Sequence, residues 1–233
     1  MGLWHNPRWD SFKLAVRGRI HAHNLLLTCW TPVVQIRERL FDLWNGIDTA
    51  GRQPFDDLTL RGSDGSDAGG YGPVRPRDFR RALSSLEIDH RQYCFVDFGS
   101  GKGRAILMAS RYPFKKIIGI EFAKELHEAA LINLRSWRWR KKCGSIELLW
   151  ADALEFDLPE EPCVLFFANP FGEARLRGVL EKAQRSIENY PRSVIVVYFQ
   201  GAHESVVESL RNVRLLSRSQ YYHYATYQIS RRW

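Results

Sequence analysis

The sequence predicts an α/β protein with a doubly wound, mostly parallel, seven-stranded sheet and an antiparallel C-terminal strand. The first observation is that, from about residue 77 onward, short apolar runs alternate with longer amphipathic stretches. Strands that alternate with helices form a parallel sheet through right-handed crossovers. The second is that the last two strand-like runs follow each other with little between them, which indicates a closing hairpin.

The elements can be placed from these patterns. The long helix has Leu126, Ala130, Leu134 and Trp137 on one face, and Gly144 suits its C-terminal cap. The expected strands cover residues 94–98, 116–122, 145–152, 163–170, 193–199, 213–220 and 222–230. The expected helices cover residues 78–86, 103–112, 123–142 and 174–187.

Two further segments precede this domain, which we place at residues 77–233. Residues 1–45 predict a helical arm in which Trp, Leu and Arg are mixed, and its first 40 residues hold six basic and two acidic side chains. Such an arm packs its apolar face on its own domain or lies on a membrane or a partner. Residues 46–76 are rich in Gly and Asp and predict a loop, either a plain linker or a lid, with Tyr71 in the stretch GGYGP.

The composition sets limits on the class of protein. The chain has 233 residues, 45% of them hydrophobic, and a net charge of +8, which favours acidic partners such as nucleic acid, anionic lipid or acidic protein, although many proteins carry such a charge without using it. The four cysteines form no C-x-x-C pair and have no His at metal-ligand spacing, so we expect neither a bound metal nor a disulfide scaffold. We expect a reducing, cytoplasmic location, no signal peptide and no transmembrane segment.

The stretch FVDFGSGKGR, residues 95–104, is compatible with several nucleotide-binding loops. A phosphate-binding P-loop is excluded, because Val96 stands where its first glycine belongs and Gly103 replaces the hydroxyl residue. A dinucleotide fingerprint fits Gly99 and Gly101 but has Arg104 in place of its third glycine, where an arginine would obstruct the close approach of helix and strand.

The third alternative is an acid followed by alternating glycines, Asp97, Gly99, Gly101 and Gly103. Glu121 ends the second strand, 18 residues after Gly103. The next two strands end in Ala151-Asp152-Ala153 and Asn169-Pro170-Phe171. Over residues 90 to 230 this pattern resembles the class I, Rossmann-like S-adenosylmethionine-dependent methyltransferases. A weaker similarity is to the Rossmann-type, non-SET protein-lysine methyltransferases, which also have a Tyr-containing segment before the first strand.

The resemblance implies S-adenosyl-L-methionine as the cofactor. In that family the glycine loop admits the amino-acid part of the cofactor and the acid of the first strand orients it. The acid of the second strand holds the ribose, and the end of the third strand holds the adenine. The implied cofactor-binding residues are Asp97, Gly99, Ser100, Gly101, Gly103, Glu121, Asp152 and Ala153.

The triplet Asn169-Pro170-Phe171 is similar to the [D/N/S]-P-P-[Y/F] motif of amine methyltransferases, and implies catalytic roles for all three residues. It departs from that motif by having one proline and a phenylalanine one place early, and it also suits a plain turn. Tyr71 and Tyr198 are candidate substrate-contacting residues. Glu173, Tyr198 and Tyr71 are the candidates for a base that takes the proton of a lysine amine.

The stretch RSWRWRKK, residues 135–142, holds five basic residues and two tryptophans. It fits either a nucleic-acid contact or the cationic C-terminus of a helix. The function we expect is methylation of an amine, with protein lysine favoured, and the alternative is RNA methylation through this basic face. An NAD-dependent oxidoreductase and an inactive cofactor-binding module are the alternatives from other classes. The sequence does not indicate the oligomeric state.

Overall fold

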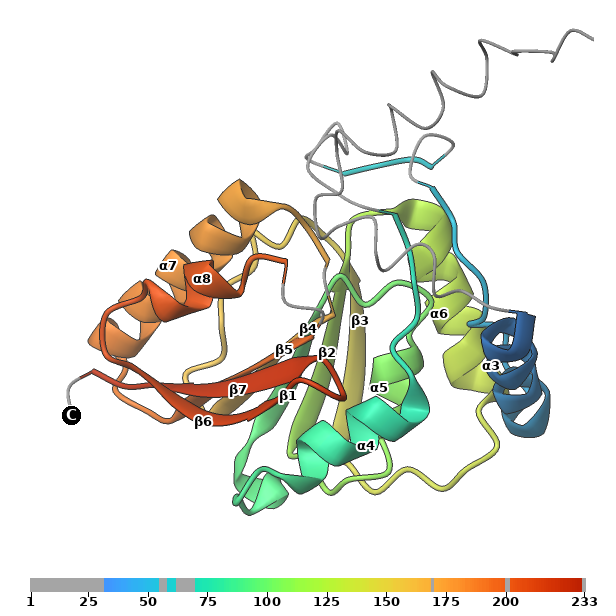
Figure 1. Cartoon of the computed structure of the whole chain (residues 1–233), viewed down its shortest axis with the longest axis horizontal. Coiled ribbons are helices and arrows are strands. Elements are labelled where there is room, and N and C mark those ends of the chain that lie inside the picture. The colour runs from blue at the N-terminus through green and yellow to red at the C-terminus, as the bar shows by residue number, and fades with distance from the viewer. Residues whose placement is uncertain (1–31, 55–57, 62–69, 169, 200–201, 232–233) are drawn as a thin grey trace, which may run out of the picture. The chain divides into compact units, whose positions relative to one another are not determined.

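The computed structural model describes residues 32–54, 58–61, 70–168, 170–199 and 202–231 (Figure 1). The chain divides into two compact units, residues 1–37 and 38–233, and the whole sheet belongs to the second unit. The strands are β1 (Cys94–Phe98), β2 (Lys116–Glu121), β3 (Ser145–Trp150), β4 (Cys163–Ala168), β5 (Val194–Phe199), β6 (Val213–Ser219) and β7 (Tyr224–Ile229). The helices are α3 (Pro32–Asn45), α4 (Pro76–Ser84), α5 (Arg104–Ala109), α6 (Lys124–Ser136), α7 (Glu173–Asn189) and α8 (Glu204–Glu208), with a 3-10 turn η2 (His90–Gln92).

The seven strands form one sheet in the order β3-β2-β1-β4-β5-β7-β6. The pairs of β1 with β2 and β4, of β2 with β3 and of β4 with β5 are parallel, whereas β7 runs antiparallel to both β5 and β6. The predicted fold class is therefore confirmed, including the antiparallel C-terminal strand. The chain order reverses between β1 and β4, and in open α/β sheets such a switch point is where ligands bind, beyond the carboxyl ends of the strands.

Helices cover both faces of the sheet, as its nearly continuous apolar strands require. One core layer joins α7 and α8 to one set of strand side chains, and the other joins α4 and α5 to the alternate set. Along β5, for example, Tyr198 belongs to the first layer and Phe199 to the second. Cys94 and Cys163 are buried in the first layer as free thiols, as the apolar runs around them predict.

The last six residues of the predicted helix 123–142 are not helical. Helix α6 ends at Ser136, because Trp137 adopts an extended backbone (φ −60°, ψ 117°) and turns its side chain into the protein. The chain then returns along the α5–β2 connection, where Lys142 N donates to Ser110 O at 2.7 Å. Gly144 N likewise donates to Phe114 O at 3.0 Å, so Gly144 caps no helix. The basic run 138–142 is therefore a loop, not the cationic end of a helix.

Other differences are small. Helix α5 stops at Ala109 instead of residue 112, and the short helix α8 was not predicted. Of the predicted helical arm the structure describes only α3, from Pro32, and the rest of the arm lies outside the described residues. The described parts of residues 46–76 are irregular, as predicted, with isolated bridges that pair Gln53 with Tyr71 and Leu60 with Ala123. Among the helices the structure describes, none has the length and apolar character to cross a membrane.

Candidate functional site

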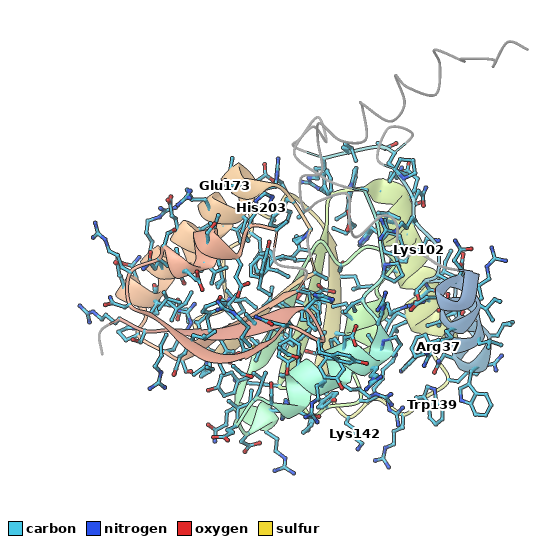
Figure 2. All side chains as sticks on the ribbon, viewed as in Figure 1. Arg37, Lys102, Trp139, Lys142, Glu173 and His203 are labelled. Carbon is cyan, nitrogen blue, oxygen red and sulfur yellow. The ribbon has the colours of Figure 1, made fainter. Side chains whose placement is uncertain are left out.

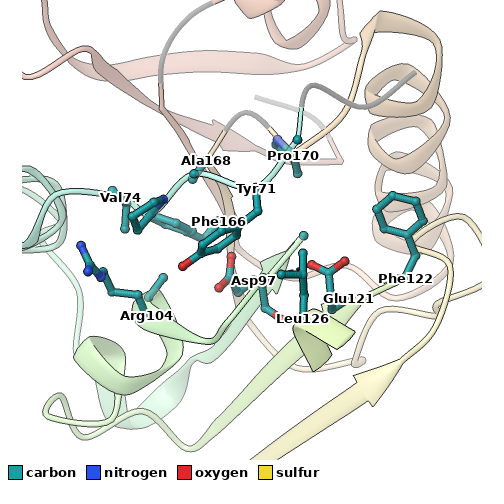
Figure 3. Close-up of a pocket in the computed structure, with 17 residues that line it drawn as sticks. Tyr71, Val74, Asp97, Arg104, Glu121, Phe122, Leu126, Phe166, Ala168 and Pro170 are labelled. Carbon is teal, nitrogen blue, oxygen red and sulfur yellow. Dashed lines mark hydrogen bonds between the residues drawn. The ribbon is translucent and has the colours of Figure 1, made fainter. Parts of the chain in front are cut away.

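A cavity opens at the carboxyl ends of β1, β2 and β4, at the switch point of the sheet (Figure 3). Its open volume is about 520 Å³, counted out to the solvent. Its lining residues are Gly70, Tyr71, Gly72, Pro73, Val74, Asp97, Gly99, Ser100, Gly101, Arg104, Ala105, Glu121, Phe122, Leu126, Phe166, Ala168 and Pro170.

The floor of the cavity is the glycine loop between β1 and α5. Gly99, Gly101 and Gly103 have φ values of +74°, +53° and +85°, a left-handed conformation that other residues adopt at a cost. The amides of Gly99 and Ser100 both donate to Ile120 O, at 2.9 and 3.0 Å, which ties the loop to β2. The alternating glycines of the sequence thus have a backbone reason. Of the predicted loop residues, Gly99, Ser100 and Gly101 line the cavity, whereas Gly103 does not.

Two carboxylates lie beside this loop. Asp97, the residue before the last of β1, and Glu121, the last of β2, line the cavity and are 2% and 3% exposed. The Glu121 carboxylate accepts from Gly101 N at 2.7 Å and from Ala123 N at 2.9 Å. Within the described part of the chain, the Asp97 carboxylate has no hydrogen-bond donor and no cation beside it.

Burial shifts the titration of both acids. It raises the pKa of Glu121 to about 7, although the backbone N–H groups that the carboxylate accepts from act in the opposite direction. The pKa of Asp97 lies well above its ordinary value, first because of burial and then because of the charge on Glu121. Two acids that repel each other in an enclosed space favour a ligand that brings positive charge or hydroxyl donors.

A smaller hollow of about 220 Å³ adjoins the first, and the two share Gly99 and Phe122. Ala153 and Phe171 contribute to its wall, together with Ile120, Ala151 and Arg175. Apart from Arg175 its lining is apolar, and it lies at the end of β3, where the binding of adenine stays a prediction.

Asp152 lies next to this hollow but does not face it freely. Its Oδ1 accepts from Leu154 N at 2.9 Å and pairs with Arg175 Nη1 at 2.5 Å. The side chain is nearly fully buried. Its assignment to the adenine amino group stays a prediction, with Arg175 as the neighbour that the carboxylate would have to share.

The end of β4 supplies the third side of the cavity. Ala168 and Pro170 line it, whereas Asn169 lies outside the described residues. Phe171 is buried in the core layer of α7 and stacks edge-on against Phe167, with ring centroids 6.3 Å apart. Pro170 therefore meets the main cavity, and Phe171 meets the smaller hollow.

The two candidate tyrosines differ in position. Tyr71 lies in the cavity, with its backbone paired to Gln53 and its hydroxyl donating to Thr49 O at 2.6 Å. The structure does not bring Tyr198 there, because even-numbered side chains of β5 point into the opposite core layer. Tyr198 is 1% exposed, its hydroxyl accepts from His203 N at 3.2 Å, and burial raises its pKa to about 12.

Several cavity residues were not singled out from the sequence. Phe122 directly follows Glu121, the acid at the end of β2, and its position beside that acid could have indicated that it lines the cavity. Phe166 is buried in an apolar strand, where no local pattern separates a cavity wall from ordinary core. Arg104 was considered only as an obstruction between helix and strand, yet its side chain turns away from the sheet and is held by α3.

No protein-family model and no curated protein matches this sequence. Solved structures do match. An RNA methyltransferase from Salinibacter ruber in complex with S-adenosyl-L-homocysteine is 17% identical, with a TM-score of 0.47, over 69% of this chain and 94% of its own. The ribosomal protein L11 methylase from Lactobacillus delbrueckii subsp. bulgaricus is 13% identical, with a TM-score of 0.45, over 67% of this chain and 78% of its own. The function is therefore argued from the cavity's own residues.

Proposed function

We propose that this chain is an S-adenosylmethionine-dependent methyltransferase that methylates an amine nitrogen, with a protein lysine as the favoured acceptor. The observation that carries this proposal is the pair of buried carboxylates, Asp97 and Glu121, beside the left-handed glycine loop. S-adenosylmethionine brings an ammonium group and a ribose diol, and these are the groups that two such carboxylates bind well.

The same pair argues against a dinucleotide. The diphosphate of NAD binds loop N–H groups at the start of the first helix. Here the Asp97 carboxylate lines the same cavity and, when charged, would repel a diphosphate, and the N–H of Gly101 already donates to Glu121. The buried guanidinium of Arg104 is paired with Glu38 and Asp42, so it offers no compensation.

The walls of the cavity support an amine as acceptor. Tyr71, Phe122 and Phe166 line it, and aromatic faces stabilise the positive charge that grows on nitrogen during transfer. Pro170 places the end of β4 against the glycine loop, next to Gly99. In this proposal Asn169 orients the acceptor N–H, as in the amine methyltransferases that the triplet resembles.

None of the three candidate bases is well placed. The Tyr71 hydroxyl donates to Thr49 O, and burial raises the pKa of that phenol well above 10, so it stays protonated. Tyr198 belongs to the other core layer, and Glu173 is exposed and paired with Arg177 at 3.0 Å. We therefore place loss of the amine proton to water before transfer, so that the rate rises with pH toward the pKa of the amine, about 10.4 for lysine.

RNA methylation is the second candidate, favoured by the exposed cations of residues 135–142 and by Arg111, which lies 4.8 Å above the Trp139 ring. However, this run follows the C-terminal end of α6, about 20 Å along the helix from the cavity. Figure 2 shows Lys142 on the opposite side from Glu173 and His203, which follow the carboxyl ends of β4 and β5. An RNA bound there would have to extend along the domain to present its base to the cavity.

The test is transfer of a labelled methyl group from S-adenosylmethionine to separated protein and RNA fractions of a cell lysate. We expect label in protein, recovered as methylated lysine after acid hydrolysis. Asp97→Asn should abolish the transfer, while Glu128→Gln, a change at an exposed carboxylate, should not. Asn169→Ala should lower kcat more than it weakens cofactor binding. Label in RNA alone would show that the acceptor is nucleic acid and not protein. Binding of S-adenosylmethionine without methyl transfer would indicate the inactive cofactor-binding module.

A further inference from the structure

A buried charged cluster lies beside the cavity and is not explained by ligand binding. Arg104, the first residue of α5, is 2% exposed and pairs with Glu38 and with Asp42, the latter at 3.0 Å. Its Nε donates to Thr49 Oγ1 at 2.6 Å. Its guanidinium lies 5.0 Å from the centre of the Phe41 ring. Each of the three guanidinium nitrogens therefore contacts a residue of α3 or of the segment after it.

A cluster of this kind is poorly explained by stability alone. Buried ion pairs often contribute no more than an apolar replacement of the same volume, because both charges lose their water. Burial indeed lowers the pKa of Arg104 to about 9 and raises the pKa of Asp42. What the fork does provide is a fixed geometry, since a planar guanidinium binds its partners in set directions.

That geometry converges on Thr49, which is fully buried. Its backbone N and its Oγ1 donate to the two oxygens of Asp42, at 2.5 and 2.7 Å. With Arg104 on the same hydroxyl, the residue is held from two helices. The carbonyl of Thr49 is the group that accepts the Tyr71 hydroxyl.

A second contact holds the same segment from α6. The amide side chain of Asn133 accepts from Asp48 N at 2.8 Å and donates to Asp48 O at 2.9 Å and to Lys102 O at 3.0 Å. Lys102 lies within the glycine loop, and Arg104 is the first residue after that loop. The segment of residues 48–53 is thus held near Lys102 through Asn133 and by Arg104 through Thr49. The same segment pairs with Tyr71 through Gln53.

We propose that Arg104 is a positioning residue for the cofactor site: by holding Thr49, it fixes Tyr71 against Gly101 and so sets the shape of the subsite above the glycine loop. The identity of the ligand rests on the proposed function, but the linkage from Arg104 to Tyr71 does not. A cluster with no influence on the cavity would affect folding stability without affecting Tyr71.

The test uses the full chain and three variants. Arg104→Lys keeps the charge but removes the fork, Thr49→Val removes the bridging hydroxyl with little change in shape, and Tyr71→Phe removes the bond to Thr49 O. Arg80→Lys, at an exposed arginine of α4, is the control. Hydrogen exchange of the Gln53 and Tyr71 amides is measured without ligand, and the Kd of S-adenosylhomocysteine is measured by calorimetry.

We expect faster exchange at Gln53 and Tyr71 in Arg104→Lys and Thr49→Val, with the amides of β1, β2 and β4 unchanged. We expect Arg104→Lys to weaken ligand binding about tenfold or more, and to have less than about a twofold effect when Tyr71 is already Phe, because the two changes then break the same link. Unchanged exchange at both amides in the milder Thr49→Val variant, or additive effects on Kd, would overturn the proposal. If the wild-type protein binds no adenosyl ligand, the proposed function fails, and the exchange result still decides the linkage.

Discussion

The ring of Tyr71 lies in the space that a side chain on Gly101 would occupy: a Cβ atom built on Gly101 would come within 2.3 Å of Tyr71 Cε2. Pro170 stands in the same relation to Gly99, with a distance of 2.4 Å to its Cβ. Segments from before β1 and from after β4 therefore meet on the same glycine loop. The glycines are needed twice, for their backbone conformation and for these two contacts.

Replacing Gly101 by Ala should disrupt the site through both effects. The backbone conformation at φ +53° costs an L-residue about 1–2 kcal/mol, and the new methyl group displaces Tyr71. Gly51→Ala is the matched control, because Gly51 also has a positive φ, +92°, but has no atom within 4 Å of the added Cβ. Chemical denaturation should show a loss of stability in both variants, larger in Gly101→Ala, and titration calorimetry should show lost adenosyl-ligand binding in Gly101→Ala alone. Equal binding by the two would mean that the Tyr71 contact is unimportant.

The contribution of Glu121 to the stability of the free protein should fall as the pH rises from about 4.5 to about 7. Glu121 titrates with a pKa of about 7 in the folded protein against an ordinary 4.5, so the folded state binds more protons in this window. The free energy of unfolding then decreases with pH, by up to about 3 kcal/mol from this group. Asp97 acts in the same direction.

Urea unfolding of wild type and Glu121→Gln at pH 5 and pH 8 measures this contribution. The variant should lose most of the decrease, whereas Glu128→Gln, at an exposed carboxylate, should keep it. The same change in the free energy of unfolding between pH 5 and pH 8 in wild type and Glu121→Gln would contradict the assigned shift.

Tyr198→Phe should leave cofactor binding unchanged. The hydroxyl removed is a hydrogen-bond acceptor for His203 N in the core layer of α7 and α8, so the loss is one of stability, about 1 kcal/mol. Denaturation and calorimetry on the same sample separate the two quantities. A large rise in Kd would show that Tyr198 communicates with the cavity in a way that its position does not suggest.

Removing positive charge from the loop after α6 distinguishes the two acceptor classes. The variant with Arg140, Lys141 and Lys142 all replaced by Gln should methylate a protein acceptor at the wild-type rate, because these side chains lie at the amino-terminal edge of the sheet. With an RNA acceptor, the rate at low acceptor concentration should drop and its dependence on salt should weaken. The measurement is the methylation rate of wild type and of the triple variant with each acceptor at two salt concentrations. An unchanged rate with RNA would contradict a role of these side chains in RNA binding.

The strand pattern was predictable because it depends on local composition. The apolar runs that form β1, β2, β4 and β5 are buried on both faces, which leaves a continuous hydrophobic signal. The glycine loop was predictable for a related reason, since its positive φ angles restrict the residue type locally. The acids Asp97 and Glu121 followed from their places at the ends of these strands.

The remaining features depend on contacts between distant parts of the chain. The end of α6 at Ser136 is set by the burial of Trp137, and a helical pattern that continues past it gives no warning. The role of Arg104 depends on acids 62 and 66 residues earlier in the sequence, which no spacing rule connects to it. Tyr198 was misplaced because its face of β5 is fixed by the register with β4 and β7.

The central claim is that the glycine loop and its two carboxylates bind a methyl donor. Its most direct test is calorimetric titration of the wild-type protein and of Glu121→Gln with S-adenosylmethionine, S-adenosylhomocysteine and NADH. The account predicts micromolar binding of the two adenosyl ligands to the wild type, at least tenfold weaker binding to the variant and no binding of NADH. Binding of NADH alone, or no binding by a folded protein, would contradict it.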